Sequence, residues 1–405
     1  MAKRNGPQLP EPWDQLTLQG LMTKGAMTSP ARVFMRDCPD REAWNGMEPR
    51  TLTFDAFFKA SHFLAAQLKT LGVEPGDRVL ILLPNTVEVS ISILACQLAA
   101  ALPALAPADE RIDTLRAAAE RCEATTILTT ARVGDVALGE KARQVAAKVL
   151  SIRCVAGFGF NLPDGIVSLE GWSEEDVVEL PARERQQSEA GLMTFSRDAD
   201  GSVCALIRTE GQMIAEALAL SSVMRLDGRR GLISLMHAGA AVSIAASLVL
   251  PMHAGASVRL VGPYRSETLA EVLDAEPTAF LLGPDHFAAQ LAPDSLGEGR
   301  LKNIAGILAL ARVEQPDAVI MSPGAMPASL VLDFNERGLM TAVKWPADGK
   351  LALPDVYQHP MESVLPEGQA MLAYGEIHEG PPLWTGFGAA ALIRRDEAKK
   401  AGKAA

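Results

Sequence analysis

The chain has 405 residues, of which 48% are hydrophobic and 21% are charged, and its formal net charge is -11. This length and apolar content predict a folded protein whose large core is divided among two or three packed lobes. The acidic balance argues against nucleic acid or an anionic membrane as a partner held by bulk electrostatics, because like charges repel. The five cysteines are widely spaced and form no CxxC pair or Cys/His cluster. Neither a zinc site nor a disulfide framework is expected. The spacing suits reduced thiols, and a cytoplasmic location is expected.

Residues 1–50 are expected to hold a leader, without the apolar stretch of a secretory signal, and the first elements. A first α/β subdomain is expected over 51–190. Apolar residues at helical spacing predict a helix over 54–71, and the run RVLILL at 78–83 predicts a strand buried on both faces. Asn85 is the expected cap of the next helix. A strand at 104–106, a helix at 112–120 and a strand at 125–130 complete a βαβαβ order, which predicts a doubly wound sheet.

One segment of this half, residues 89–108, carries no charged side chain and has the length of a membrane span. It contains Ser90, Ser92 and Gln97, and two prolines interrupt it. A buried helix followed by a strand explains this composition better than a span does. No membrane span is expected.

A second α/β subdomain is expected over 191–345, after a charged, Gln-rich linker at 174–190. Its predicted strands are at 191–195, 231–236, 257–261, 278–282, 305–310 and 318–321, and its predicted helices are at 210–223, 240–250, 266–274 and 327–337. Residues 346–395 are rich in Pro and Gly and predict a small β-rich lobe. Residues 396–405 are expected to be a charged tail. The predicted fold class is therefore α/β, with two doubly wound sheets and a small β-rich lobe.

Several segments match a known pattern in order and spacing. They are residues 51–107, which contain GVEPGDRV and LPN, then RTEGQM at 208–213, ISLMHAGAAVS at 233–243, LPMHAGASVRLVGPY at 250–264, MSPGAMPASL at 321–330 and LWTGFGA at 383–389. In these segments the chain resembles the large N-terminal domain of the adenylate-forming superfamily, which includes acyl- and aryl-CoA synthetases. The resemblance covers about 50–395. It also implies a mobile C-terminal domain, which the sequence is expected to lack.

The resemblance implies a chemistry in which a carboxylic acid attacks the α-phosphate of ATP, after which a thiol displaces AMP. In the family a loop of the form TSGTTGxPKG holds the phosphates. Residues 194–208 read TFSRDADGSVCALIR, in which Thr194 and Gly201 match the loop. Arg197 occupies the position of a serine in the family loop, and Cys204 occupies the position of the lysine. Two further positions of the loop are occupied by aspartates. A negative charge about 5 Å from a triphosphate costs roughly 3 kcal/mol. ATP is expected to bind poorly, unless Arg197 or a metal held by the two aspartates compensates.

Other family positions are also altered. Trp345 and Asp348 lie where the family stacks adenine and holds magnesium, and Thr385 begins a Thr-Gly-Asp motif whose aspartate is replaced by Phe387. Trp345 is a candidate to stack a base, and Asp348 is a candidate metal ligand.

The resemblance also supplies a candidate substrate pocket. It includes His237, at the position of a histidine that lines the acyl pocket, and Ser322, Gly324 and Ala325, in a turn beside it. A satisfied core histidine explains His237 equally well, and an ordinary Pro/Gly turn explains the other three.

Two hypotheses from different classes follow. In the first, the chain is a non-catalytic or impaired relative that binds an apolar carboxylic acid, an acyl thioester or a protein partner. In the second, it is a working acid–CoA ligase that uses ATP and Mg²⁺ through Arg197 and Asp348 or Asp200, or together with a separate C-terminal domain. A decayed gene product with a fold and no role is a third possibility. Binding of ATP with magnesium separates the first two.

Overall fold

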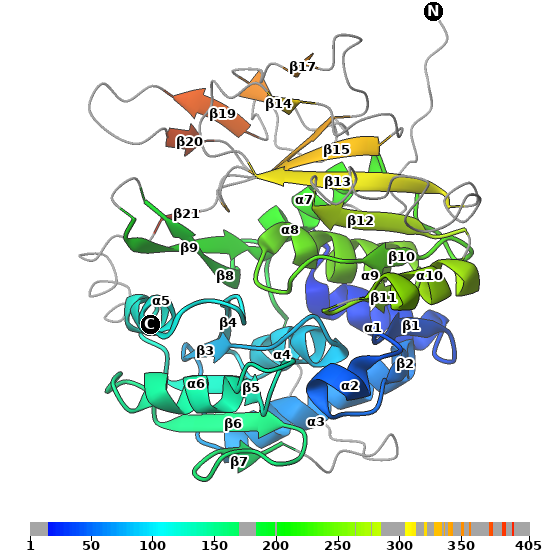
Figure 1. The fold of residues 1–405 in the computed structure, drawn as a ribbon. Coiled ribbons are helices and arrows are strands. Elements are labelled where there is room, and N and C mark those ends of the chain that lie inside the picture. The colour runs from blue at the N-terminus through cyan, green and yellow to red at the C-terminus, as the bar shows by residue number, and fades with distance from the viewer. Residues whose placement is uncertain are drawn as a thin grey trace, which may run out of the picture.

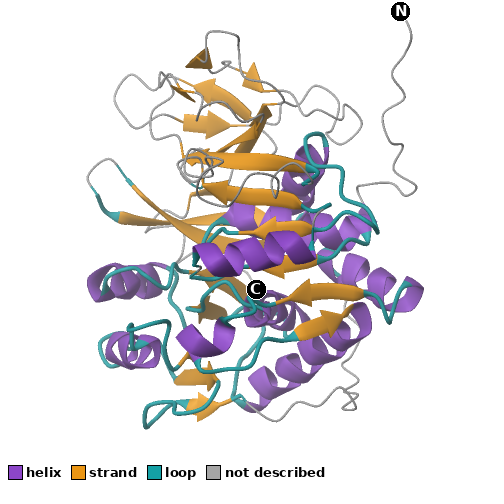
Figure 2. Ribbon diagram, turned by 45° about the vertical axis from the view of Figure 1, so that its right-hand side comes forward, coloured by secondary structure: helices purple, strands orange, loops and turns teal. Residues whose placement is uncertain are grey.

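The structure is a computed structural model that describes residues 15–169, 184–198, 201–263, 265–276, 278–284, 304–312, 320–321, 328–333, 336, 339–342, 350–351, 356–357, 372–375, 383–385 and 391–392. Its described strands form two eight-stranded sheets and two small sheets. Figure 1 places the two large sheets one above the other, and Figure 2 shows helices on their flanks. This arrangement confirms the predicted α/β class with two parallel-rich sheets.

The first sheet has the strand order β21-β9-β8-β4-β3-β5-β6-β7. Strands β3 to β8 are parallel where they pair, whereas β9 is antiparallel to both β8 and β21. Its strands are β3 (Arg78–Ile81), β4 (Leu102–Leu105), β5 (Thr126–Thr130), β6 (Cys154–Phe158), β7 (Val167–Ser168), β8 (Ala190–Arg197), β9 (Val203–Thr209) and β21 (Ala391–Leu392), and its helices are α3 (Phe54–Thr70), α4 (Val87–Leu98), α5 (Ile112–Arg121) and α6 (Leu138–Ala146).

The second sheet has the strand order β16-β15-β13-β12-β10-β11-β1-β2. Its strands are β1 (Val33–Arg36), β2 (Thr51–Thr53), β10 (Leu232–Ser234), β11 (Val258–Leu260), β12 (Phe280–Pro284), β13 (Gly306–Arg312), β15 (Ala328–Asp333) and β16 (Leu339–Ala342). The remaining helices are α1 (Leu18–Thr28), α2 (Arg41–Asn45), α7 (Glu210–Ser221), α8 (Ala241–Ile244), the π-helix η2 (Ala245–Val249), α9 (Leu250–Ala254) and α10 (Ser266–Ala275). Only the two edge strands β2 and β16 are antiparallel to their neighbours.

The small sheets belong to the C-terminal part of the chain. One pairs β14 (Ile320–Met321) with β17 (Lys350–Leu351), and the other has the order β18-β19-β20, with bounds Val356–Tyr357, Leu372–Gly375 and Leu383–Thr385. All of their pairings are antiparallel. These strands agree with the small β-rich lobe predicted from the Pro- and Gly-rich composition.

Sheet membership does not follow the expected subdomain limits. Strands β8 and β9 continue the first sheet to Thr209, beyond the limit expected at residue 190, and β1 and β2 join the second sheet through β11. The chain therefore contributes to the second sheet before it builds the first. The subdomain limits drawn from the sequence stay a prediction, because a chain that passes between sheets has no single natural boundary.

Alternating side chains of β3 supply two separate cores. Val79 and Ile81 belong to a large apolar cluster that extends into the second subdomain, whereas Leu80 and Leu82 belong to a smaller cluster beneath α5 and α6. Because successive side chains of a strand point to opposite faces, one apolar run serves both cores. This explains why residues 78–83 read as a continuous apolar run without alternation.

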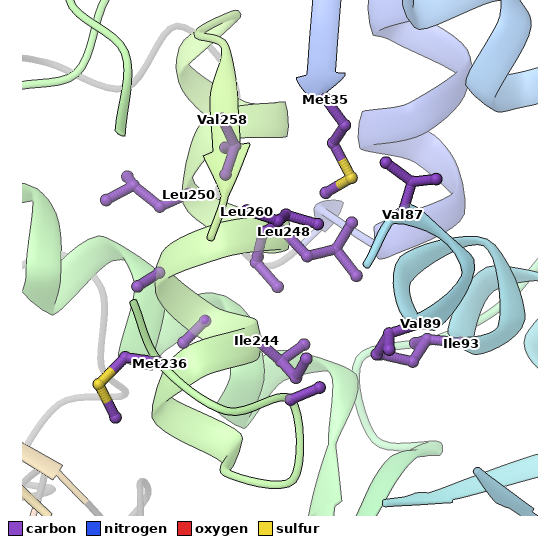
Figure 3. Close-up of a cluster of buried hydrophobic side chains, with 14 of the residues drawn as sticks. Met35, Val87, Val89, Ile93, Met236, Ile244, Leu248, Leu250, Val258 and Leu260 are labelled. Atoms are coloured by element: carbon purple, nitrogen blue, oxygen red, sulfur yellow. The ribbon is translucent and has the colours of Figure 1, made fainter. Parts of the chain in front are cut away.

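The larger core joins the two subdomains. In Figure 3, Val89 and Ile93 of α4 face Ile244 of α8 and Leu248 of η2, and all four side chains are buried. Helix α7 contacts β8 and β9 of the first sheet and β16 of the second. Burial of this apolar surface stabilises the contact between the two sheets by about 25 cal/mol per Å².

Three local predictions differ from the structure. Residues 327–337 were expected to form a helix, but 328–333 form strand β15, because the short apolar run ASLVL suits either element and a parallel neighbour, β13, is present. Asn85 does not cap α4: it donates to the carbonyls of Ser234 and Val261, and Asp37 accepts the N–H of Val87 instead. The helix expected over 240–250 contains the π-helix η2 and runs on through α9.

The apolar segment 89–108 forms most of α4 and all of β4, as expected for a buried helix and strand. In the part of the chain that the structure describes, no helix has the length and apolar character needed to cross a membrane.

A buried ionic cluster ties the start of the chain to α4. The Arg41 guanidinium pairs with Asp37 and, at 2.9 Å, with Glu88, and all three side chains are almost fully buried. Arg50 adds a second cation, 3.1 Å from Glu88. Burial, followed by the nearby Glu88 charge, raises the pKa of Asp37 to about 6. Arg41 is therefore the cation that both buried carboxylates share, and Arg50 assists it at Glu88.

Replacement of Arg41 by methionine tests this cluster. We expect Arg41→Met to lower the free energy of unfolding by about 3–5 kcal/mol, because two buried carboxylates lose their main counter-charge. Urea denaturation at pH 7 measures the change. Lys59→Met is the matched control: Lys59 pairs with Asp55 at the surface of α3, so its loss should change stability by less than about 1 kcal/mol. Equal effects of the two variants would contradict the prediction.

Candidate functional site

The segment predicted to hold phosphates is a tight β-hairpin. Strands β8 and β9 pair in register up to Arg197 and Val203. Beyond that pair, the Asp198 N–H donates to the Ser202 carbonyl at 2.9 Å, and the Gly201 N–H donates to the Asp198 carbonyl at 2.8 Å. Gly201 has a φ of 80°, which places it in the left-handed region that favours glycine. A left-handed glycine next to the last pair of two antiparallel strands is typical of a tight β-hairpin turn.

The hairpin uses backbone groups that a phosphate loop leaves open. Phosphate-binding loops present several consecutive N–H groups to the ligand. In this chain the N–H groups of Asp198 and Gly201 are both bonded within the turn. Cys204, at the position of the family lysine, is buried within β9 and paired in register with Ser196. In this conformation these two N–H groups are therefore not available to a phosphate.

Arg197, the candidate phosphate cation, contacts the first subdomain. Its Nη2 lies 3.1 Å from the Glu110 carboxylate and 3.2 Å from the Thr114 hydroxyl, and about half of its side chain is exposed. The Glu110 carboxylate neutralises the positive charge of Arg197, which a phosphate group would need for binding. Arg197 would have to exchange Glu110 for a ligand in order to bind one.

Arg208 anchors a buried polar network behind the hairpin. Its guanidinium bonds Glu216 of α7 at 3.0 Å, the Thr194 hydroxyl at 3.2 Å and the Glu336 carbonyl at 2.6 Å. The side chains of Arg208 and Glu216 are almost fully buried, and burial raises the pKa of Glu216. Thr194, a candidate nucleotide contact, is buried and shares this network. One side chain of the first sheet thus holds the loop that follows β15 of the second sheet.

Two carboxylates and an arginine lie at the carboxyl end of the second sheet. Arg312 and Asp333 are register partners at the ends of β13 and β15, and their charged groups approach to 3.5 Å. The Glu336 carboxylate lies 3.4 Å from Arg312 and accepts the Ala241 N–H, at the start of α8, at 3.0 Å. Glu336 also donates its N–H to Asp333 at 2.9 Å. Burial, then the Glu336 charge, raises the pKa of Asp333 to about 7.

His237 follows β10 at the same edge. The residue is exposed, and its Nδ1 accepts the Gly239 N–H at 3.2 Å. The surrounding protein desolvates the imidazole and lowers its pKa, while Asp109 acts in the opposite direction and Arg312 adds to the lowering. Since the pKa lies below its usual value, His237 is mainly neutral at pH 7 and presents a polar, uncharged ring. It is therefore not a satisfied core histidine.

The two subdomains meet closely beside His237. A side chain added at Gly239 would lie 2.8 Å from the Pro107 nitrogen, so only glycine permits this approach. Pro107 follows β4 of the first sheet, and Asp109 and Glu110 come next. In open α/β sheets, ligands bind outside the carboxyl ends of the strands. The residues described above gather at such a position, between the carboxyl ends of strands from both sheets.

The remaining candidates fall outside the site that can be described. Ser322, Gly324, Ala325, Trp345 and Asp348 lie outside the described residues. Thr385 is the last residue of β20, in the three-stranded sheet. Among the described residues, no group of three or more His, Cys, Asp or Glu side chains could hold a metal ion.

Sequence reasoning missed most of the network. The roles of Arg208, Glu216, Arg312, Asp333 and Glu336 were not predicted. One signal was present: Arg208, Glu216 and Asp333 are charged residues within strongly apolar segments, where a charge needs a buried partner. The sequence did not reveal which partner each would find.

The AMP-binding enzyme family matches residues 31–340, more than half of the chain. Together with the fold, this match shows that the chain belongs to the AMP-binding enzyme family. Its sequence is 27% identical over 219 residues to the salicyl-AMP ligase / salicyl-S-ArCP synthetase of Mycobacterium tuberculosis, a match that covers 53% of this chain and 37% of that protein. It is 30% identical over 134 residues to a salicylyl-CoA synthase / salicylate adenylyltransferase of Streptomyces, covering 33% of this chain and 24% of that protein. The chain thus spans less than half the length of these relatives.

Solved structures agree on the fold. The apo structure of Mycobacterium smegmatis MbtA superposes with a TM-score of 0.71 at 17% identity, covering 96% of this chain and 70% of that one. ATP-bound MatB from Rhodopseudomonas palustris gives a TM-score of 0.67 at 14% identity, covering 95% of this chain and 74% of that one. At these identities the likeness concerns the fold alone.

A double-mutant cycle tests the Arg208 network. We expect Arg208→Met to lower the free energy of unfolding by about 3–5 kcal/mol, because Glu216 is left charged and unpaired in the core. Arg208→Met combined with Glu216→Leu should recover most of that loss, since the unpaired charge is removed as well. Chemical denaturation of the two single variants and the double variant measures the coupling. Additive losses would show that Arg208 and Glu216 do not depend on each other.

The raised pKa of Asp333 predicts a pH dependence of stability. The pKa of its carboxyl is about 7 in the folded protein and has an ordinary value of 3.8, so the folded state keeps a proton that the unfolded state releases. The resulting stabilisation is present below pH 3.8 and is lost as the pH rises through 7. Relative to Asp333→Asn, wild-type stability should fall between pH 4 and 7, by up to about 1.4 kcal/mol per pH unit. Urea denaturation across this range measures the difference; parallel profiles would refute the assignment.

Proposed function

We propose that this chain is a member of the AMP-binding enzyme family that binds a carboxylic acid or its thioester and has little or no ability to adenylate it. The observation that carries the proposal is the closed hairpin at 198–202. Two backbone N–H groups are bonded within its turn, two aspartates stand in it, and the family lysine is replaced by the buried Cys204. The nearest candidate cation, Arg197, is paired with Glu110.

The energetic argument concerns charge at the triphosphate. ATP with magnesium needs donors and cations that are already oriented towards the phosphates. One added carboxylate at about 5 Å costs roughly 3 kcal/mol at an effective dielectric of about 20, and loss of the lysine removes a comparable stabilisation. Together these changes weaken nucleotide binding by several orders of magnitude. Thr194, Arg197 and Gly201 stay predictions as nucleotide contacts, as do Trp345 and Thr385.

Retention of an acid site is supported by the region around His237. This neutral imidazole lies at the carboxyl end of β10, next to the close approach of Gly239 and Pro107. Two relatives are named for the activation of salicyl groups. We therefore propose an aryl or acyl acid as the ligand, with Ser322, Gly324 and Ala325 as further candidate contacts. A protein partner remains part of the proposal. None of the five cysteines forms a disulfide, which supports a reducing, cytoplasmic location.

A working ligase is the alternative, and the names of the curated relatives favour it. It would need Arg197 to leave Glu110 and contact a phosphate. Asp348 or Asp200 would hold magnesium, or a separate C-terminal domain would complete the site.

Calorimetric titration of the purified chain distinguishes these functions. We expect no heat of binding from 1 mM ATP with magnesium, and a clear response to at least one member of a panel of aryl acids, acyl acids and their CoA thioesters. An AMP-binding enzyme with the intact TSGTTGxPKG loop serves as the positive control for ATP. Micromolar binding of ATP would overturn the proposal in favour of the ligase. If no acid or thioester gave a heat of binding, the ligand-binding role would be excluded and binding of a protein partner would be the function still proposed.

A further inference from the structure

Arg312 lies at the carboxyl end of a strand in the second sheet, and among the described residues its guanidinium has N–H groups that are not used in ion pairs. It ends β13, a central strand flanked by β12 and β15, and 49% of its side chain is exposed. Register pairing aligns Ser234 with Leu282 and Leu282 with Leu308 across β10, β12 and β13. Arg312 ends β13, and His237 follows the end of β10, from which β13 is separated by β12. The two side chains are near enough for the Arg312 charge to lower the pKa of His237. A small ligand seated at this edge would lie between them.

The ion pairs of Arg312 are longer than those of the buried arginines. Its contacts with Asp333 and Glu336 measure 3.5 and 3.4 Å, whereas Arg208 lies 3.0 Å from Glu216 and Arg41 lies 2.9 Å from Glu88. These contacts involve Nε and Nη2 of Arg312. Within the described part of the chain, no acceptor contacts Nη1. Because a guanidinium carries five N–H donors, Arg312 can take a further carboxylate without giving up the existing pairs.

The neighbouring carboxylates do not cancel this charge. Asp333 accepts the Glu336 N–H and keeps its proton up to about pH 7, since burial raises its pKa. The Glu336 carboxylate is also bound to the Ala241 N–H at the start of α8, and Glu110 is paired with Arg197. Among the acidic groups that influence His237, this leaves Asp109 without a described ion pair. Arg312 therefore keeps part of its positive charge.

We infer that Arg312 binds the carboxylate of the acid ligand and selects it over the neutral amide of the same shape, with His237 on the opposite side of the ligand. A bidentate contact of guanidinium with carboxylate suits this geometry, because two parallel N–H groups meet two oxygens. The inference rests on the proposed acid-binding function and names the group that recognises the acid.

The test compares salicylate and benzoate with salicylamide and benzamide by calorimetry on the full chain. For the wild type we expect the acids to bind at least tenfold more tightly than the amides. Arg312→Gln should lose at least tenfold in affinity for the acids and change the affinity for the amides by less than twofold. Arg153→Gln is the matched control: Arg153 is 52% exposed and paired with Asp77, but lies at the amino end of β6 in the other sheet. It should match the wild type.

A second variant keeps the test independent of any folding defect in Arg312→Gln. At pH 8, above its pKa of about 7, Asp333 is ionised, so Asp333→Asn should bind the acids about threefold more tightly than the wild type at that pH. If Arg312→Gln retains acid selectivity, or if Arg153→Gln loses it equally, the inference is overturned while the acid-binding function stands. Weaker acid binding by Asp333→Asn would also overturn the inference. If the wild type binds none of the four probes, the acid-binding function and this inference fall together.

Discussion

The buried guanidinium of Arg208 holds the candidate site together. It belongs to β9 of the first sheet, yet it bonds the carbonyl of Glu336, which follows β15 of the second. The carboxylate of Glu336 in turn orients the start of α8 and contacts Arg312. A charge taken out of water is costly unless every donor finds a partner, and here the partners come from both sheets. The relative position of the sheets, and with it the geometry of the site, is therefore fixed by charge satisfaction as well as by apolar packing.

The turn between β8 and β9 carries residues that differ from the family loop, while the two strands beside it belong to the first sheet. Strands β8 and β9 pair without interruption from Leu192 to Arg197, and α7 begins at Glu210 with a complete capping box on Thr209. Only the tip differs, where Asp198 and Gly201 suit a tight turn that bonds its own N–H groups. Asp198 adds a negative charge to this segment, and its N–H is bonded within the turn. Electrostatics and backbone geometry act in the same direction.

Much of the fold could be predicted from the sequence because it depends on local patterns. Helix α3 was expected over 54–71 and spans Phe54–Thr70, and the strands of the first sheet followed from short apolar runs between turns. Strand β15 could not be predicted in this way, since ASLVL suits a helix or a strand and the outcome depends on β13 as a neighbour. The site was harder to predict. Thr194, Arg197 and His237 were predicted from the family resemblance and stay candidates, whereas the contacts of Arg312 and Glu336 depend on partners that are distant in sequence.

The passage of the chain between sheets also has a consequence for folding order. β1 pairs with β11, about 220 residues later, so the edge of the second sheet that β1 and β2 form cannot close until most of the chain has been synthesised. Such long-range pairing slows folding, because a large loop must close before any contact is gained. During that interval Phe34 and Met35, which point to opposite faces of β1 and are buried in the folded protein, lack part of their cover, although α3 contacts β1. A fragment that begins at β3 would carry an unpaired β11 edge and should aggregate, so the two subdomains are not independent folding units.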